Sequence, residues 1–158
     1  MQDEVINRQL ESVQSKLKEP SLRTSVLCDC VVRAMVCKLF QPVDHRPPDN
    51  LSFAHIHALE LAQKGNIGEK KIGYLACCML LDEESDLLLL LVNTIVRDLK
   101  SDNVIEINMA LITAAQLIPP EMVPMIFPIV LQRSKHSKVH TQIWTHYSTE
   151  TDFPCFYL

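Results

Sequence analysis

A repeat of 36 residues constrains the fold of this chain more than any other feature of its sequence. When the second half is shifted by 36 residues, Leu75-Ala76 aligns with Leu111-Ile112. The same shift aligns Leu81 with Leu117, Ile95 with Leu131, Arg97 with Arg133 and Ser101 with Ser137. Each unit holds two apolar helical segments and a short turn, and one helix pair cannot bury both of its apolar faces. The repeat therefore predicts an all-α protein, a right-handed superhelical solenoid of armadillo/HEAT-like helix pairs that cover one another.

Apolar residues spaced three and four apart predict seven helices, and alternation at period two is too weak to predict a sheet. The predicted segments are residues 3–18, 22–40, 52–64, 69–81, a fifth that runs to about residue 100, 104–118 and about 121–134. An acidic turn at residues 82–85 is expected to open the fifth helix. The apolar run Leu87 to Val92 in that helix predicts burial nearly all round, between repeats. Pro124 and Pro128 predict a late start or a kink in the seventh helix.

Two segments depart from the helical pattern. Residues 41–50 contain Pro42, Pro47 and Pro48, and successive prolines disfavour helix, so a loop is expected there. From about residue 135 the apolar and aromatic residues, among them Trp144 and Phe153, form no clear face. The sequence therefore predicts a helical-repeat domain over residues 1–138 and an atypical, poorly ordered tail over residues 139–158.

Charge and hydropathy exclude several classes of protein. The net charge is -4 and no stretch is densely basic, which argues against nucleic-acid binding. The longest apolar run, Leu87 to Val92, is far shorter than the ~18–20 residues that a membrane span needs. The first residues are acidic, where a secretory signal would be basic. We expect a soluble, cytoplasmic chain whose 6 cysteines stay reduced.

Candidate catalytic and metal-binding residues all have simpler structural explanations. His55 and His57 fall on different faces of a helix, and His136 and His140, with Asp152 and Cys155 nearby, are expected in a solvated tail. The pairs Cys28/Cys30 and Cys77/Cys78 lack Cys-x-x-Cys spacing and are expected to be core residues. Asp82, Glu83 and Glu84 fit the start of a helix. We therefore expect no enzyme activity, no catalytic, cofactor-binding or metal-binding residues, and unspecified partner-binding residues.

Two further motifs are weak. Gly65-x-x-Gly68 followed by Lys70-Lys71 lacks the strand and the spacing of a phosphate-binding loop, so it is interpreted as a turn between helices with a solvated basic edge. The ending Cys155-Phe156-Tyr157-Leu158 has the form of a prenylation signal, but its middle positions are not aliphatic and no basic stretch precedes it. A chance ending is the preferred interpretation.

Several stretches resemble the N-terminal trunk of the large adaptin chains of vesicle coat adaptor complexes. They are residues 58–66, 69–76 with Lys71-Ile72-Gly73-Tyr74-Leu75, Leu80-Leu81-Asp82-Glu83, Leu87 to Ile95, and Asp98-Leu99 with Ser101. The leucine-rich helix, together with Ala110-Leu111 through Met122, is most similar to epsilon chains of the fourth adaptor complex. The resemblance covers residues 4–138; the proline-rich link and Ala54, where the family has glycine, depart from it. The chain is expected to be a truncated form, because the family continues through many more repeats.

The resemblance implies a non-catalytic subunit without cofactor. Such chains assemble with sigma, beta and mu adaptor chains, are recruited by an ARF-type small GTPase, and sort cargo as peripheral proteins on trans-Golgi network membranes. The phosphoinositide site of the endocytic alpha chain is not carried over, because its lysine cluster is replaced here by Leu27-Cys28-Asp29-Cys30. Two alternatives stay open: another helical-repeat scaffold such as a transport receptor, and a truncated product without assembly function.

Overall fold

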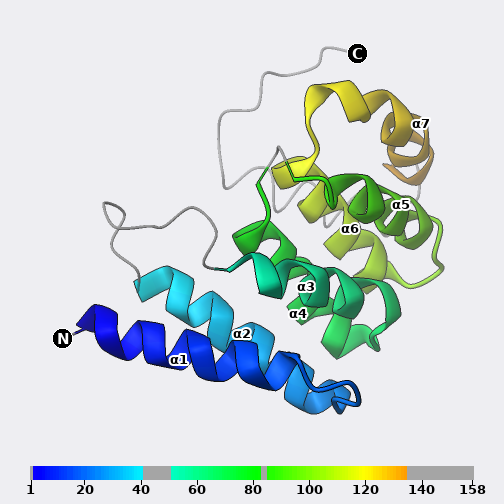
Figure 1. The fold of residues 1–158 in the computed structure, drawn as a ribbon. Helices are drawn as coiled ribbons and strands as arrows, with labels where there is room; N and C mark the ends of the chain where they lie inside the picture. The colour runs from blue at the N-terminus through cyan, green and yellow to red at the C-terminus, as the bar shows by residue number, and fades with distance from the viewer. Residues whose placement is uncertain (1, 41–50, 83–84, 135–158) are drawn as a thin grey trace.

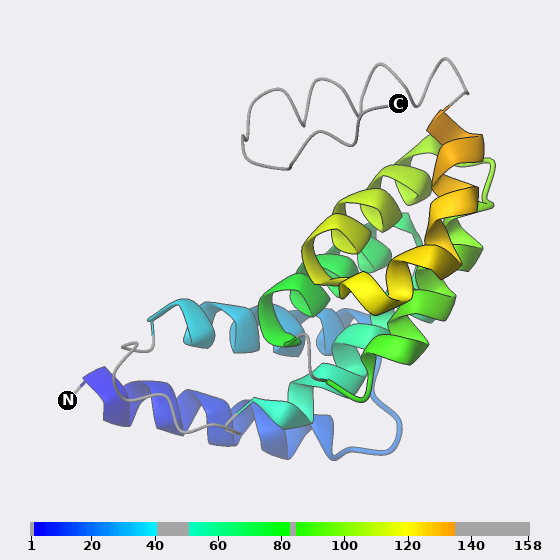
Figure 2. The same ribbon diagram turned by 90° about the horizontal axis from the view of Figure 1, so that it is seen from above.

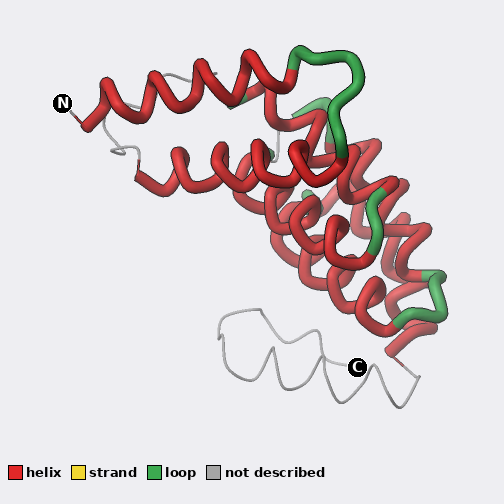
Figure 3. The backbone as a smooth tube through the Cα atoms, turned by 90° about the horizontal axis from the view of Figure 1, so that it is seen from below, coloured by secondary structure: helices red, strands yellow, loops and turns green. Residues whose placement is uncertain are grey.

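The computed structural model describes residues 2–40, 51–82 and 85–134, and within these ranges the chain is built from helices (Figure 1). The elements are α1 (Gln2–Leu17), α2 (Thr24–Phe40), α3 (Ser52–Lys64), α4 (Ile67–Leu80), α5 (Leu88–Leu99), α6 (Val104–Leu117), the 3-10 helix η2 (Pro120–Met122) and α7 (Val123–Ser134). No strand occurs in the described part of the chain (Figure 3). The prediction of an all-α fold is confirmed.

The helices stack as pairs in two layers. α1 packs on α2, α3 on α4, and α5 on α6. Neighbouring pairs then join through α2, α4 and α6 in one layer, and through α3, α5 and α7 in the other. Figure 2 shows α1 and α2 at one end of the stack and α7 at the other. This is the predicted solenoid of helix pairs, in which each pair covers an apolar face of the next.

One continuous apolar core runs through the stack. Its members with no more than 2% exposure include Val13, Val31, Leu59, Leu80, Leu91 and Ile95. The leucine-rich run of α5 contributes Leu88, Leu91 and Val92 to this core. Leu89 and Leu90, however, are about half exposed, so the expectation of burial all round is wrong. α5 is buried on the side that packs against α3, α6 and α7 and is exposed on the side that carries Leu89 and Leu90.

Capping chemistry explains where α4 begins. Asn66 accepts a hydrogen bond from the backbone N–H of Glu69 at 3.0 Å, and the Glu69 carboxylate accepts one from the N–H of Asn66 at 2.7 Å. This reciprocal pair satisfies two of the donors left free at a helix start. The helix therefore begins at Ile67, before the predicted start at residue 69. Asn103 caps α6 in a similar way, accepting from the N–H of Ile105 at 2.9 Å.

The sequence predicted the start of α7 but not the start of α5. The acidic residues expected in the first turn of α5 lie before it: the helix begins at Leu88, after a turn in which Ser85 N–H bonds the Asp82 carbonyl at 3.0 Å. The expected acidic first turn is therefore wrong. α7 begins at Val123 after η2, which confirms the predicted late start. Pro128 lies inside α7 and lacks the N–H that would bond the carbonyl of Pro124.

The repeat is real, but its register differs from one helix to the next. α4 begins at residue 67 and α6 at residue 104, an offset of 37, whereas α5 begins at 88 and α7 at 123, an offset of 35. The offset of 37 aligns exposed Leu75 with exposed Ile112, and buried Leu80 with buried Leu117. A uniform shift of 36 aligned Leu75 with the buried Leu111, which is wrong by one residue. The offsets of 37 and 35 lie on either side of the predicted 36, because the connection before α7 is shorter than the connection before α5.

Some sequence predictions lie outside the described residues. They concern the loop at residues 41–50, the division at residue 138, the tail at residues 139–158 and the prenylation-like ending at Cys155. None of the described helices combines the length and the apolar character that crossing a membrane requires.

Candidate interaction surfaces and a buried polar network

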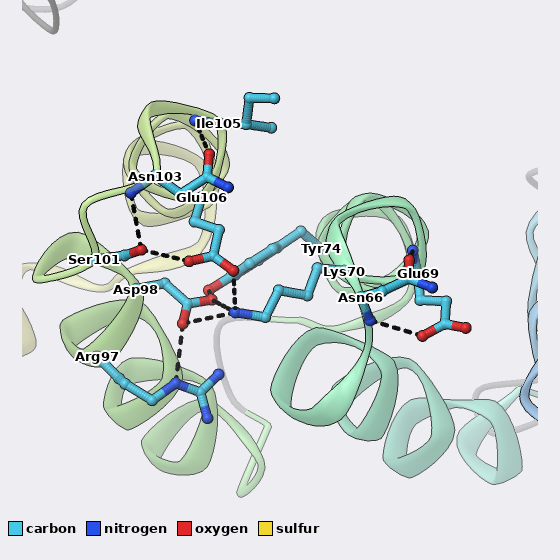
Figure 4. A network of polar contacts seen from close by, with 10 residues as sticks. All are labelled: Asn66, Glu69, Lys70, Tyr74, Arg97, Asp98, Ser101, Asn103, Ile105 and Glu106. Carbon is cyan, nitrogen blue, oxygen red and sulfur yellow. Dashed lines mark hydrogen bonds and ion pairs between the residues drawn. The ribbon is translucent and has the colours of Figure 1, made fainter.

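A lysine inside the stack joins three helices. Lys70 of α4 donates to both carboxylate oxygens of Asp98 on α5, at 3.1 and 3.0 Å. It also donates to Oε1 of Glu106 on α6 at 2.8 Å (Figure 4). The side chains of Lys70 and Asp98 are 10% and 2% exposed, so this charge pair lies almost entirely out of water. The lysine therefore ties α4 to both helices of the next repeat.

Neutral and charged neighbours complete the hydrogen bonding of the two carboxylates. The Tyr74 hydroxyl donates to Asp98 Oδ2 at 2.8 Å, and Arg97 Nε donates to Asp98 Oδ1 at 2.9 Å. On the other side, the Ser101 hydroxyl donates to Glu106 Oε2. Ser101 in turn accepts the backbone N–H of Asn103 at 3.1 Å, which links the network to the cap of α6 (Figure 4). A buried charge cluster is tolerated when its lone pairs are used in this way.

The electrostatics of the network favour a fixed arrangement over catalysis. Hydrogen bonds from Lys70 and then Ser101 hold the pKa of Glu106 below its usual value. Burial, reinforced by the charge of Asp98, raises the pKa of Tyr74 far above its usual value. Tyr74 therefore stays protonated and Glu106 stays charged near neutral pH, as donor and acceptor respectively. Both groups are engaged in hydrogen bonds that hold the helices together.

Lys70 corrects one sequence interpretation. The stretch from Gly65 to Lys71 does form a turn and a helix start, but only Lys71 lies on a solvated edge. Lys70 is buried. The sequence signal for the burial of Lys70 was its spacing from apolar residues. Tyr74 and Cys77 follow Lys70 at four and seven residues on the buried face of α4. On α5, Asp98 likewise follows Leu91 and Ile95. Opposite charges on two apolar stripes indicate a buried ion pair, and the sequence reasoning missed it.

The cysteines of the described residues behave as core side chains. Cys30, Cys37 and Cys77 are buried, and Cys28 and Cys78 are partly buried. Burial raises the pKa of Cys77 to about 12, so its thiol stays protonated and unreactive. The Cys78 thiol donates to the Thr113 hydroxyl at 3.5 Å and thus joins α4 to α6. The predicted placement in or against the core is confirmed for these five.

The described histidines form no metal centre. No group of three or more His, Cys, Asp or Glu side chains suitable for a metal occurs within the described ranges. His57 Nδ1 is buried without a hydrogen bond and lies 3.9 Å from Glu60 Oε2. The candidates His136, His140 and Cys155 lie outside the described residues.

A cavity of about 360 Å³ lies where the α1–α2 turn meets the end of α3 and the start of α4. Its charged lining consists of Glu19, Glu60, Glu69 and Lys64, with His57 beside them. Lys64 is paired with Glu60 at 3.2 Å. Three carboxylates against one ammonium disfavour an anionic headgroup, in keeping with the missing lysine cluster on α2.

Apolar side chains are exposed on several of the described helices, among them Leu39 and Phe40 on α2 and Leu89 and Leu90 on α5. The α4–α6 face consists of Leu75, Ile105 and Ile112, which point outward from neighbouring helices of one layer. On α7, Val123 and Phe127 are exposed four residues apart and share one side of the helix, whereas Met125 is exposed on the opposite side. Exposed apolar patches of this kind commonly mark contacts with another protein segment.

The chain consists of stacked helix pairs, with a structural ion network inside the stack and apolar side chains exposed on its surface. These features define the class of protein, a helical-repeat scaffold that acts through its surfaces. A family model for the adaptin N-terminal region matches residues 2–140, so nearly the whole chain is accounted for by one family. The chain belongs to the adaptin family.

Its relatives are adaptor-complex subunits. The chain is 38% identical over 137 residues to AP-4 complex subunit epsilon-1 of Mus musculus and of Homo sapiens, which covers 87% of this chain and 12% and 11% of those proteins. It is 29% identical over 137 residues to AP-4 complex subunit epsilon of Arabidopsis thaliana, covering 14% of that protein. The chain thus spans about one-eighth of the length of these relatives. No solved structure matches it closely enough to be significant.

Proposed function

We propose that this chain is a non-catalytic scaffold segment of a coat adaptor large subunit, acting in vesicle-mediated transport and cargo sorting. The observation that carries the proposal is the family match over residues 2–140. The identities to AP-4 epsilon subunits point the same way. The site chemistry agrees, because the charged groups of the core are engaged with one another and hold helices together.

The finer assignments rest on the family resemblance. We propose that the partners are the sigma, beta and mu chains of a fourth-type adaptor complex and an ARF-type small GTPase. We propose the cytoplasmic side of trans-Golgi network membranes as the place of action, reached as a peripheral protein through the complex. The chain would then need no cofactor of its own.

The α4–α6 face is the surface that we propose for the sigma chain. Leu75 and Ile112 occupy equivalent exposed positions in successive repeats, so together they form an apolar strip along one layer. A partner that buries this strip would remove apolar surface from water while contacting two repeats at once. The neighbouring exposed Lys71 supplies a charge at the edge of the strip.

Co-expression with the sigma chain of the fourth adaptor complex, followed by size-exclusion chromatography, tests this proposal. We expect a 1:1 complex with the unchanged chain and its loss with Leu75→Asp/Ile112→Asp. Leu89→Asp is the matched control, because Leu89 is as exposed as Leu75 but lies on α5 in the other layer. Separate elution of the unchanged chain, while the full-length epsilon chain binds, would contradict an assembly role for this chain.

A further inference from the structure

The cavity between the α1–α2 turn, the end of α3 and the start of α4 is lined by both apolar and acidic side chains. Its volume of about 360 Å³ lies within the range of ~300–1,000 Å³ that is common for ligand pockets. Leu17 of α1, Leu27 of α2 and Leu61 of α3 line it and are themselves buried. The cavity therefore has room for a long side chain and offers apolar surface to the hydrocarbon part of that chain.

The charged lining of this cavity is unbalanced. It holds three carboxylates, those of Glu19, Glu60 and Glu69, and one lysine ammonium group. Three carboxylates against one ammonium leave two negative charges in excess. The basic residues of the adjacent turn, Lys18 and Arg23, are exposed and do not line the cavity. A positively charged occupant is therefore favoured on charge complementarity.

Two of the carboxylates have capacity for a further hydrogen-bond donor. Glu60 pairs with Lys64 at 3.2 Å, but the Lys64 side chain is 74% exposed, and exposed pairs of this kind contribute little. Glu69 accepts the backbone N–H of Asn66 through Oε2 (Figure 4). Because an ionised carboxylate accepts several hydrogen bonds, both groups can bind an incoming cation without giving up these contacts.

Gly65 allows the tight turn that brings α3 and α4 together at the cavity. A Cβ at this position would lie 2.6 Å from the Cβ of Glu69 and 2.6 Å from the carbonyl oxygen of Leu61. Gly65 itself lines the cavity. The absence of a side chain therefore lets carboxylates from two helices, Glu60 on α3 and Glu69 on α4, line one space.

We propose that this cavity binds an arginine side chain presented by a segment of a partner protein. The aliphatic part of the arginine lies against Leu17 and Leu61, while its planar guanidinium offers five N–H donors to Glu60 and Glu69. A metal ion fits less well, because the described residues contain no group of three or more side chains suitable for one. None of the lining residues belongs to the α4–α6 face, so this inference does not depend on the sigma-chain proposal.

Titration of the ¹⁵N-labelled 158-residue chain with N-acetylarginine amide, followed by NMR, tests the proposal. We expect saturable shifts of the Gly65 and Glu69 amide signals, with a dissociation constant on the order of 1 mM. N-acetylcitrulline amide has nearly the same shape without the charge and should bind at least tenfold more weakly. Glu60→Gln and Glu69→Gln should each weaken binding several-fold, and glutamine at residue 69 keeps the acceptor that caps α4.

Lys64→Met supplies a change that unfolding cannot imitate. It removes the ammonium group that competes for Glu60, so binding should become several-fold tighter. Glu121→Gln is the matched control, because it removes the same charge from an exposed carboxylate outside the cavity and should leave the affinity within twofold. Equal binding of the citrulline amide would overturn the proposal. Equal losses in Glu60→Gln and Glu121→Gln, or unchanged affinity in Lys64→Met, would overturn it as well.

Discussion

At the scale of single residues, the network around Lys70 joins side chains of three helices, α4, α5 and α6. Its ammonium group pairs with carboxylates on two different helices, at 3.0 Å from Asp98 and 2.8 Å from Glu106. Arg97 supplies a second positive charge, 2.9 Å from Asp98. A buried pair of this kind adds little net stability over an apolar core, but losing one partner leaves charge without compensation. Its value lies in fixing how α4 sits against α5 and α6.

Lys70→Met should destabilise the fold by about 3–5 kcal/mol, because Glu106 would lose its counter-charge and the buried Asp98 would keep only the half-exposed Arg97. Urea unfolding followed by circular dichroism gives the free energy of unfolding. Lys71→Met is the matched control: Lys71 is exposed, and its change should stay within about 0.5 kcal/mol. Equal effects of the two substitutions would contradict the role assigned to Lys70.

The lowered pKa of Glu106 predicts how the stability of the fold changes in acid. Lys70 and Ser101 hold its folded-state pKa below the usual 4.5, so folding favours the carboxylate. Its contribution is therefore present above pH 4.5 and is lost as the pH falls through the lower folded-state value. Melting temperatures between neutral and acidic pH should show a smaller acid-induced drop in Glu106→Gln than in the unchanged chain. Glu121→Gln, an exposed carboxylate beside α7, should keep the full drop.

At the scale of elements, the closest helix contact is that between α3 and α4. A Cβ built at Gly73 would come within 2.9 Å of the Ala58 carbonyl and 2.8 Å of the Leu61 carbonyl carbon. It would also collide with the backbone nitrogen of Ala62. The absent side chain thus lets the two backbones touch, and this gives a physical reason for glycine within the Lys71 to Leu75 motif.

Gly73→Ala should cost about 1–3 kcal/mol, because rigid backbone and not a movable side chain occupies the space. Gly68→Ala is the matched control in the same helix. A Cβ there meets only Asn66 Oδ1 at 3.4 Å, so alanine should be neutral or raise stability by up to about 1 kcal/mol. Thermal melts of both variants measure the difference, and a destabilised Gly68→Ala with an unaffected Gly73→Ala would refute this account of the α3–α4 contact.

At the scale of the whole molecule, the helices differ in how well they are held. α4 packs against α2, α3 and α6, whereas α1 packs chiefly against α2. The cavity of about 360 Å³ between the α1–α2 turn and α3 reduces contact there further. In a repeat stack each element is stabilised by its nearest neighbours, so the first helix should open at a lower free energy than the centre.

Hydrogen exchange measured by mass spectrometry should therefore show faster exchange in peptides from α1 than in peptides from α4. The expected difference is at least tenfold, which corresponds to about 1.4 kcal/mol in the free energy of local opening. The control is α3, which packs tightly on α4 and should exchange slowly as well. Uniform protection across α1 and α4 would mean that the stack opens as one cooperative unit.

The sequence by itself determined the helices, the breaks between them and the family. The helices and breaks depend on local chemistry, because apolar spacing along each segment and prolines act within a few positions of one another. The structural role of the cysteines also followed from their place in apolar stripes.

Only the tertiary structure decided which side chains and helices contact one another and which are exposed. It set the unequal offsets of 37 and 35, buried Lys70 beside Asp98, exposed Leu89, and brought Gly73 against α3. No single segment contains this information, because Lys70 and Asp98 are 28 residues apart and their pairing depends on how two repeats pack. The exposure of Val123 and Phe127 on α7 has the same origin, since the exposure of a helix depends on its neighbours in the stack and not on its own sequence alone.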